Sequence, residues 1–426
     1  MDVPGAPALL VLADDLSGAA ETAAVFLSRT TRTELVLGAA AVDGVPAGTD
    51  VVVVDLDDRE VVPAEAAART AAALAAGPPP VRVLAKLDSL LRGTVAARVG
   101  ALRARGGVVV APALPALGRV VRDGVLTVDG VPLAATRAWA TQGTPAPDTV
   151  AAALPTLPTV VLDLSTVRSD RLAAALTRAV RAGRVPVCDG ERDADLDAVV
   201  AAVATASAEL PGLALAGSAG VATALAQTRS AASGAPPPPP PRPGAPGPLV
   251  VVGSAESTAA AQVSRLVDAG VPELRLPAAE LLAPGPAGDE AGHLAAALAT
   301  GPVVVRPDPA APVDPRDSRR LAAGLGALAA RVVVRTGQPV DLVLTGGETA
   351  RRVLDALGVD RLTPVGQVHH GAVVSRLPGG SLVVTRPGSF GDPDSLLAIL
   401  AALHPPQPRT PPLTTASSRG STEGTP

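Results

Sequence analysis

ALLVLADDLSGA, at residues 8–19, carries the clearest signal of the fold class. An apolar run, Ala8–Leu12, is followed by two carboxylates, Asp14 and Asp15, and then by small residues that suit the first turn of a helix. A short apolar run bounded by turn residues is typical of a strand that is buried on both faces. The stretch therefore predicts a parallel strand that opens into a helix.

Similar apolar runs recur along the chain, and Ala-rich segments with helical spacing, such as 64–76 and 171–182, lie between them. The predicted strands are residues 8–12, 51–55, 81–85, 108–111, 160–164, 213–216, 249–252, 302–306, 341–345 and 381–385. Alternation of strand and helix is characteristic of largely parallel sheets that are covered by helices on both faces. We therefore expect an α/β protein.

A proline-rich segment divides the chain, whose 426 residues exceed one ordinary core. It contains the unbroken proline run Pro236–Pro241, which favours a semi-rigid polyproline II spacer. We predict two α/β domains with largely parallel sheets, at 1–228 and 249–404, joined by a Pro-rich linker at 229–248. The remaining segment, 405–426, is rich in Pro, Ser and Thr and is predicted to be disordered.

Whole-chain composition excludes several classes of function. Hydrophobic residues make up 47% and charged residues 18%, and the formal net charge of -4 provides no field that would attract nucleic acid. The single cysteine, Cys188, excludes an internal disulfide and a thiolate zinc site. The sequence has no run of 18 apolar residues, and its start lacks a basic segment, so we expect neither a membrane span nor a signal peptide. We expect a cytoplasmic protein with small-molecule partners.

Lys86 is the one lysine among 36 Lys and Arg residues, in a chain without Tyr and with two Phe. This composition resembles mutational drift toward Gly, Ala, Arg and Pro. A lysine retained under such drift is a candidate for a position that needs a compact ammonium group rather than a planar guanidinium. Chance retention on a solvated face is the alternative.

Polar residues follow two of the predicted strands. Asp14 and Asp15 lie where ligands bind in open α/β sheets, at the carboxyl end of a strand. They can accept hydrogen bonds from substrate hydroxyls, and one could act as a base or help to hold a metal ion. In the alternative interpretation, Asp15 or Ser17 only caps the helix.

The segment KLDSLLRG, residues 86–93, follows the strand at 81–85. Lys86 and Arg92 supply cationic donors, Ser89 a hydroxyl and Asp88 an acceptor, a set that suits a polyhydroxy carboxylate. A surface ion pair between Lys86 and Asp88 is the alternative. APALPALGR, residues 111–119, then forms an irregular loop after the strand at 108–111, and its Arg119 could contact an anion.

In the second half, GSAEST at 253–258 and TGGET at 345–349 place small residues before a helix, where free N–H groups and the helix dipole favour phosphate. A further loop, RPGSFGD at 386–392, follows the last predicted strand. Each turn alone is more often structural. Three of them at strand ends within one domain favour a nucleotide site.

In content and order, DDLSGA, KLDSLLRG, APALPALGR with DGVPL, GSAES, TGGET and GSFGD resemble the four-carbon acid sugar kinase family across both domains. The resemblance implies an N-terminal sugar-acid-binding domain and a C-terminal nucleotide-binding domain. It also implies phosphorylation, with ATP and Mg²⁺, of the terminal hydroxyl of a tetronate such as erythronate, threonate or a 3-oxo form.

The resemblance implies two groups of site residues. Those that would face the sugar acid are Asp14, Asp15, Lys86, Asp88, Ser89 and Arg92, with Asp15 and Asp88 as the catalytic candidates. Those that would face ATP are Ser254 or Ser257, Gly346, Gly347, Glu348, Thr349 and Gly388. The base among Asp14, Asp15 and Asp88 stays open, as does the choice between Lys86 and Arg92 for the substrate carboxylate; the metal ligands are unknown.

Two segments depart from the family pattern. Arg386 and Pro387 stand in a loop that usually reads Lys-Ser-Gly-Asn-Phe-Gly, and residues 367–371, QVHHG, replace a Pro-Gly-Val-Pro pattern. A binding protein that has lost catalysis is therefore one rival. An NAD-dependent sugar-acid dehydrogenase is another, although no strand-helix turn carries the G-x-G-x-x-G fingerprint.

Overall fold

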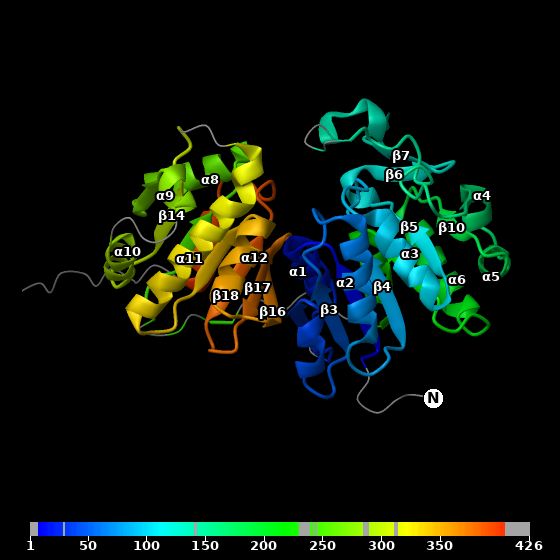
Figure 1. Ribbon diagram of the computed structural model, residues 1–426, viewed down its shortest axis with the longest axis horizontal. Coiled ribbons are helices and arrows are strands. Elements are labelled where there is room, and N and C mark those ends of the chain that lie inside the picture. Colours follow the sequence, from blue (N-terminus) through cyan, green and yellow to red (C-terminus); the bar gives the residue numbers. More distant parts are fainter. Residues whose placement is uncertain are drawn as a thin grey trace, which may run out of the picture.

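The computed structural model describes residues 7–28, 30–139, 142, 144–229, 239–240, 242, 245–283, 289–310 and 314–404. Most of the predicted linker and all of the predicted tail at 405–426 lie outside the described residues. Figure 1 shows two α/β bodies side by side, with the first half of the chain (blue to green) forming one and the second half (green to red) the other.

The first half forms a parallel sheet in the order β2-β3-β1-β4-β11-β5-β10-β9. Its strands are short and largely apolar, as strands covered on both faces are. They are β1 (Leu9–Ala13), β2 (Thr33–Leu37), β3 (Val51–Asp55), β4 (Arg82–Lys86), β5 (Val108–Ala111), β9 (Thr159–Leu162), β10 (Val185–Cys188) and β11 (Ala214–Gly217).

Helices and a small antiparallel sheet complete this half. The helices are α1 (Leu16–Val25), α2 (Pro63–Ala75), α3 (Val95–Gly106), α4 (Leu164–Val167), α5 (Leu172–Arg181), α6 (Asp193–Ala206) and α7 (Ala219–Arg229). The antiparallel sheet consists of β6 (Arg119–Arg122), β7 (Val125–Val128) and β8 (Val131–Pro132), and it extends from the chain just after β5. The predicted irregular loop at 111–119 leads into this sheet.

The second half has the strand order β13-β14-β12-β15-β18-β17-β16, parallel from β13 to β18 and antiparallel beyond. The strands are β12 (Leu249–Val252), β13 (Glu273–Leu276), β14 (Val303–Pro307), β15 (Leu342–Thr345), β16 (Arg361–His369), β17 (Ala372–Arg376) and β18 (Leu382–Arg386). The helices are α8 (Ser257–Asp268), α9 (Ala278–Leu282), α10 (Glu290–Leu298), α11 (Ser318–Thr336), α12 (Gly347–Ala356) and α13 (Ser395–Leu403).

The two sheets meet edge to edge. β16 pairs with β2 in antiparallel fashion, with Arg361 opposite Val36 and Leu362 opposite Leu35. Helix α1 lies at the same junction and packs against α12, β16 and β17 of the second half (Figure 1). The start of α1 therefore faces both domains.

The predicted fold class is confirmed. Each predicted strand is present within two residues of its expected bounds, and the predicted helices at 64–76 and 171–182 correspond to α2 and α5. The strands are buried because helices cover both faces of the sheet: all five residues of β1, for example, are at most 2% exposed.

Candidate functional site

Polar side chains converge at the carboxyl edge of the N-terminal sheet. Asp14 and Asp15 follow β1, Lys86 ends β4, and Asp88 lies two residues further on. β1 and β4 are hydrogen-bonded neighbours, with Ala13 opposite Lys86. Because adjacent parallel strands end at the same edge of a sheet, the first two sequence motifs come together there.

Arg59, in the loop after β3, lies at the centre of this group. Its Nε is 2.8 Å from Asp14 Oδ2, its Nη1 is 2.9 Å from Asp15 Oδ2, and its Nη2 is 3.9 Å from Asp88 Oδ1. Burial alone would raise the pKa of Asp14, but the positive charges of Arg59 and of neighbouring cations hold that pKa below its ordinary value. Asp14 is therefore ionised although it is 2% exposed.

Asp88 forms a two-pronged ion pair with Arg92. Arg92 Nε lies 2.9 Å from Asp88 Oδ2, and Nη2 lies 2.7 Å from Oδ1. Leu91 adopts a φ of 62°, an unusual value for a branched side chain, in the turn that brings Arg92 back to Asp88. Burial opposes ionisation of Asp88, but the hydrogen bonds from Arg92 and the charge of Arg59 outweigh it and lower its pKa.

Lys86 points toward the start of α1. It is 6% exposed, and a Cβ placed on Gly18 would lie 3.2 Å from Lys86 Nζ and 2.8 Å from Asp15 Oδ1. Asp15 caps α1 by accepting a hydrogen bond from the N–H of Gly18 at 2.8 Å. The capping role that the sequence allowed is thus confirmed, and it coexists with the ion pair to Arg59.

Beneath these groups, Arg98 of α3 ties the strand ends together. Its Nη1 donates to the carbonyl of Lys86 at 3.0 Å, and its Nη2 donates to the carbonyl of Leu12 at 2.6 Å. Its Nε is 3.6 Å from Asp58 Oδ2. Burial raises the pKa of Asp58 to about 6, even though the charge of Arg98 acts to lower it.

In the second half, several of the predicted nucleotide residues also come together. A Cβ on Gly388 would overlap the hydroxyl of Ser254, and a Cβ on Gly346 would lie 3.7 Å from both Ser254 Cβ and Thr349 Oγ1. Gly346 has a φ of 98°, which glycine adopts without strain. Three separate turns, those after β12, β15 and β18, therefore converge on one place.

Two predicted residues are placed differently. Ser257 is exposed at the first position of α8. Glu348 Oε1 accepts hydrogen bonds from Arg319 Nε at 3.0 Å and Arg352 Nε at 2.8 Å. The carboxylate of Glu348 is thus engaged by two arginines of its own domain.

Arg386, which replaces the lysine usual in the family loop, is 1% exposed. Burial lowers its pKa to about 10, and its Nη2 donates to the carbonyl of Phe390. Gln262 Nε2 donates to the carbonyls of Gly391 at 3.3 Å and Asp392 at 2.8 Å. Two buried donors therefore hold the carbonyls of this loop on its inner side.

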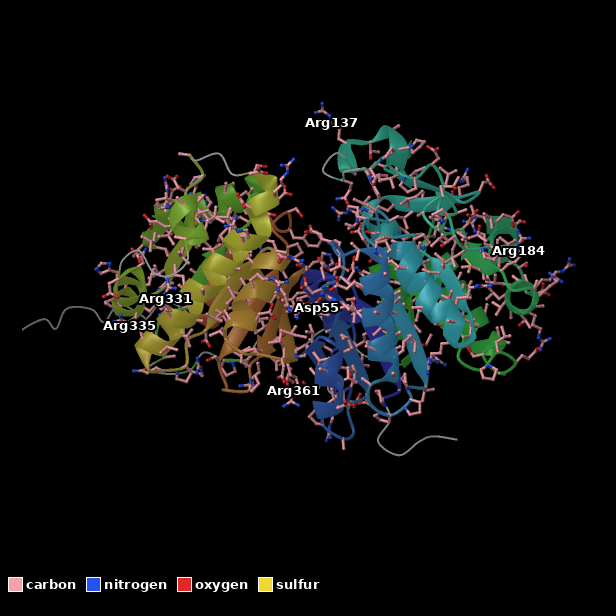
Figure 2. All side chains as sticks on the ribbon, viewed as in Figure 1. Asp55, Arg137, Arg184, Arg331, Arg335 and Arg361 are labelled. Carbon is pink, nitrogen blue, oxygen red and sulfur yellow. The ribbon has the colours of Figure 1, made fainter. Side chains whose placement is uncertain are left out.

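The two clusters adjoin at Gly347, the first residue of α12. A Cβ on Gly347 would lie 2.7 Å from Ser17 Oγ and 3.4 Å from Asp15 Oδ2. The TGGET turn of the second domain thus lies directly against the DDLS turn of the first. Figure 2 labels Asp55, at the end of β3, near this boundary.

A cavity of about 350 Å³ opens beside the converging turns of the second domain. Ser254, Arg306, Asp308, Leu321 and Leu325 are among the residues that line it. Its walls come mainly from β12, β14 and α11, and both apolar and charged residues line it. Such a mixed cavity is typical of small-molecule sites.

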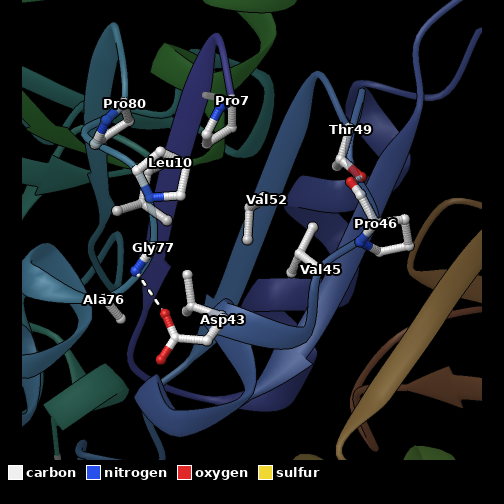
Figure 3. Close-up of a pocket in the computed structure, with 12 residues that line it drawn as sticks. Pro7, Leu10, Asp43, Val45, Pro46, Thr49, Val52, Ala76, Gly77 and Pro80 are labelled. Atoms are coloured by element: carbon white, nitrogen blue, oxygen red, sulfur yellow. Dashed lines mark hydrogen bonds between the residues drawn. The ribbon is translucent and has the colours of Figure 1, made fainter. Parts of the chain in front are cut away.

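Another cavity, of about 130 Å³, lies at the opposite edge of the N-terminal sheet (Figure 3). Leu10 and Val52 line it, and Asp43 accepts a hydrogen bond from the N–H of Gly77 at 2.8 Å. Because ligands of open α/β sheets bind at the carboxyl ends of strands, we do not assign this cavity to the site.

Comparison with known proteins finds one family model for each half of the chain. A family model described as a sugar-binding N-terminal domain matches residues 9–225, and one described as a nucleotide-binding C-terminal domain matches residues 249–396. This chain belongs to the four-carbon acid sugar kinase family.

Two relatives of this family cover nearly the whole chain. The D-threonate kinase of Cupriavidus necator is 36% identical over 415 residues, which are 91% of this chain and 96% of that protein. The D-threonate kinase of Bordetella bronchiseptica is 30% identical, over 94% of this chain and 98% of that protein.

Solved structures share the fold. A crystal structure described as a putative tRNA synthase from Salmonella typhimurium has a TM-score of 0.72 at 21% identity and covers 92% of this chain and 98% of that one. A protein from Haemophilus influenzae has a TM-score of 0.70 at 20% identity, over 91% of this chain and 98% of that one. At this level of identity they support the fold alone.

Within this member of the four-carbon acid sugar kinase family, the sugar-binding match contains Arg59 and Arg98, which sequence reasoning missed. A signal for Arg59 was present, because DLDDRE at 55–60 places charged residues directly after a predicted strand. Arg98 gave no such signal, since it lies within a helix.

In the part of the chain that the structure describes, no helix is both long and apolar enough to cross a membrane.

Proposed function

We propose that this chain transfers the γ-phosphoryl group of ATP to the terminal hydroxyl of a four-carbon sugar acid, a tetronate or a 3-oxo-tetronate. One observation carries the proposal: the Gly347 turn lies against Asp15 and Ser17, so that a phosphate at one turn would meet a hydroxyl at the other. The substrate class is supported by the relatives named D-threonate kinase.

We assign the nucleotide to the three converging turns of the C-terminal domain. α12 has ten residues and begins at Gly347, and the N-terminus of a helix favours phosphate through free N–H groups and the helix dipole. Because Gly346 and Gly388 lack a Cβ, the turns that carry them pack closely against Ser254. The neighbouring cavity, with Leu321 and Leu325 in its wall, suits the apolar faces of a nucleobase.

Asp15 is the carboxylate that we assign to the acceptor hydroxyl. Asp14 is 2% exposed and paired with Arg59, and Asp88 is held at both oxygens by Arg92. Asp15 is also paired with Arg59, but its side chain is 24% exposed, against 3% for Asp14 and 7% for Asp88, and its Oδ2 faces Gly347. Phosphoryl transfer depends chiefly on in-line positioning and charge neutralisation, which Asp15 and the nearby Lys86 ammonium can provide.

Mg²⁺ would enter this site with the nucleotide. Among the described residues no group of three or more metal-ligating side chains is present, which fits an ion that is held mainly by phosphate oxygens and water. Asp15 is the carboxylate of this chain that could complete its shell. When bound, the ion would neutralise developing charge on the phosphates.

The test is an ADP-release assay with ATP and Mg²⁺ against erythronate, threonate, their 3-oxo derivatives and glycerate. We expect turnover on at least one tetronate, and a loss of about 10²- to 10⁴-fold in kcat for Asp15→Asn. Binding of ATP and of a tetronate without any turnover would favour a non-catalytic binding protein instead. Hydride transfer from the same acids to NAD⁺ would favour the dehydrogenase.

A further inference from the structure

Arg119 occupies a position that the site described above leaves unexplained. It begins β6, and its backbone pairs with Leu114: Leu114 N–H donates to the Arg119 carbonyl at 2.7 Å, and Arg119 N–H donates to the Leu114 carbonyl at 3.1 Å. The side chain is half-buried, and its Nη1 donates to the hydroxyl of Ser89. The antiparallel hairpin therefore brings a guanidinium against the KLDS turn.

The cationic side chains at the carboxyl edge of the N-terminal sheet have different partners. Arg59 is paired with Asp14 and Asp15, and Arg92 is paired with Asp88. Within the described residues, neither Arg119 nor Lys86 forms an ion pair with a carboxylate within 4 Å, and of the two it is Arg119 that contacts Ser89. The Nε of Arg119 is buried without a hydrogen-bond partner.

An uncompensated guanidinium of this kind is unfavourable in the unliganded protein. Burial lowers the pKa of Arg119, and the more distant charge of Asp88 only partly opposes this effect. A partly buried charge without a partner costs free energy, and a ligand carboxylate can supply two charge-assisted hydrogen bonds to a guanidinium. Ser89, 6% exposed, provides a neighbouring hydroxyl.

The sheet topology sets the direction of the ligand. β4 follows β1 in the strand order, and β11 and β5 lie beyond it, on the side away from the C-terminal domain. Asp15 follows β1 and adjoins Gly347, whereas Arg119 follows β5. A short acid whose hydroxyl end lies at Asp15 would therefore direct its other end toward Ser89 and Arg119.

We propose that Arg119, together with Ser89, binds the carboxylate of the sugar acid and so sets the preference of the site for acids over neutral polyols. The proposal rests on the proposed function, and it moves the carboxylate away from Lys86 and Arg92, the two groups that the sequence suggested. Lys86 is left beside Asp15, at the end where phosphoryl transfer would occur.

The test compares a charged substrate with a neutral one. KM and kcat of the wild type, Arg119→Ala and Arg119→Lys are measured with D-threonate and with its amide, which keeps every hydroxyl but lacks the charge. We expect Arg119→Ala to raise KM for D-threonate by about 10- to 100-fold, the loss expected for a charge-assisted hydrogen bond, and to change KM for the amide by less than about threefold. Arg119→Lys should recover part of the binding of the acid.

The control variant is Arg122→Ala, on the same strand. Arg122 is exposed and pairs with Glu191 at the surface, so its loss should leave both substrates unaffected. An equal rise in KM for acid and amide in Arg119→Ala, or no rise for either, would overturn the assignment while leaving the kinase intact. Absence of turnover in the wild type, together with no D-threonate binding by calorimetry, would instead remove the proposed function on which it rests.

Discussion

Arg351 and Asp55 form an ion pair across the two domains: Arg351 Nη1 lies 2.9 Å from Asp55 Oδ2. Asp55 ends β3 and is 0% exposed, while Arg351 lies on α12 of the C-terminal domain. Two residues later, Asp57 accepts hydrogen bonds from Arg352 and from Arg319 Nη2, the latter at 3.0 Å. Arginines of the C-terminal domain therefore hold the loop that leads to Arg59.

Asp55 should make stability depend on pH. Burial raises its pKa to about 7 from an ordinary value of 3.8, although Arg351 acts to lower it. Below that pH the folded protein retains a proton on Asp55 that the unfolded chain releases, and the ion pair with Arg351 is complete only above it. This contribution to stability is therefore present below about pH 4 and is lost as the pH rises toward 7. The difference is about 4 kcal/mol at most.

The measurement is the urea midpoint of the wild type and of Asp55→Asn at about pH 4.5 and about pH 8, between which the folded-state carboxyl loses its proton. We expect the urea midpoint of the wild type to decrease from the lower to the higher pH by more than that of the variant. Parallel changes in the two proteins would show that Asp55 titrates normally.

The arginine pairs at Asp57 should couple the two ligands. Loss of Arg352 would remove an arginine partner from both Asp57 and Glu348 and leave each paired with Arg319, so we expect Arg352→Ala to raise KM for both ATP and the sugar acid by about 3- to 10-fold. Because coupling is reciprocal, each ligand should also enhance binding of the other less in the variant. Calorimetric titrations with and without the second ligand measure this.

Arg335→Ala is the matched control for Arg352→Ala. Arg335 lies on α11, and it pairs with Asp289 at 3.0 Å on an exposed surface (Figure 2). Its loss should alter neither KM value. Equal behaviour of the two variants would contradict a coupling role for Arg352.

Gly347 should tolerate no side chain while Ser17 is present. A Cβ on Gly347 would lie 2.7 Å from Ser17 Oγ, closer than atoms pack, so Gly347→Ala must rotate the Ser17 hydroxyl away or displace one turn from the other. We expect kcat to fall by about 10-fold or more, since phosphoryl transfer is sensitive to positioning. The double variant Ser17→Ala/Gly347→Ala removes the overlap and should recover part of the loss relative to Ser17→Ala alone. Strictly additive losses would argue against contact between the turns.

Arg59 should be irreplaceable by lysine. An ammonium group lacks the fork that reaches Asp14 and Asp15 at once, so Arg59→Lys should lower kcat/KM by about 100-fold while the protein stays folded. Arg82→Lys, at the exposed opposite end of β4, is the control. Steady-state kinetics measures kcat/KM of both variants, and circular dichroism checks that they are folded. Near-normal kcat/KM in Arg59→Lys would exclude the bridging role of Arg59.

The sequence predicted well those elements whose signal is local. Apolar runs such as 51–55 and 108–111 became β3 and β5 with unchanged bounds, because strands buried on both faces need continuous apolar residues. Within the main sheet, β2, β10, β13, β16 and β17 were not predicted. β16, for example, contains Pro364 and Gly366 and lies where the sheets join, and these residues lower the strand signal.

The candidate site follows the same rule. Asp14, Asp15, Lys86 and Asp88 were identifiable because they lie at or just after the ends of apolar runs. The placement of Arg119 against Ser89 depends on a hairpin, and that of Gly347 against Ser17 depends on how two domains meet. Contacts of this kind join residues that are far apart in the chain, so no local sequence pattern predicts them.

Phosphorus NMR of a reaction containing the wild-type protein, ATP, Mg²⁺ and D-threonate tests the central proposal most directly. We predict that the γ-phosphate signal of ATP is replaced, one for one, by a phosphomonoester signal split by the two protons of a terminal CH₂ group. Conversion of ATP to ADP and inorganic phosphate alone, or an unchanged spectrum for D-threonate and for the other tetronates, would contradict it.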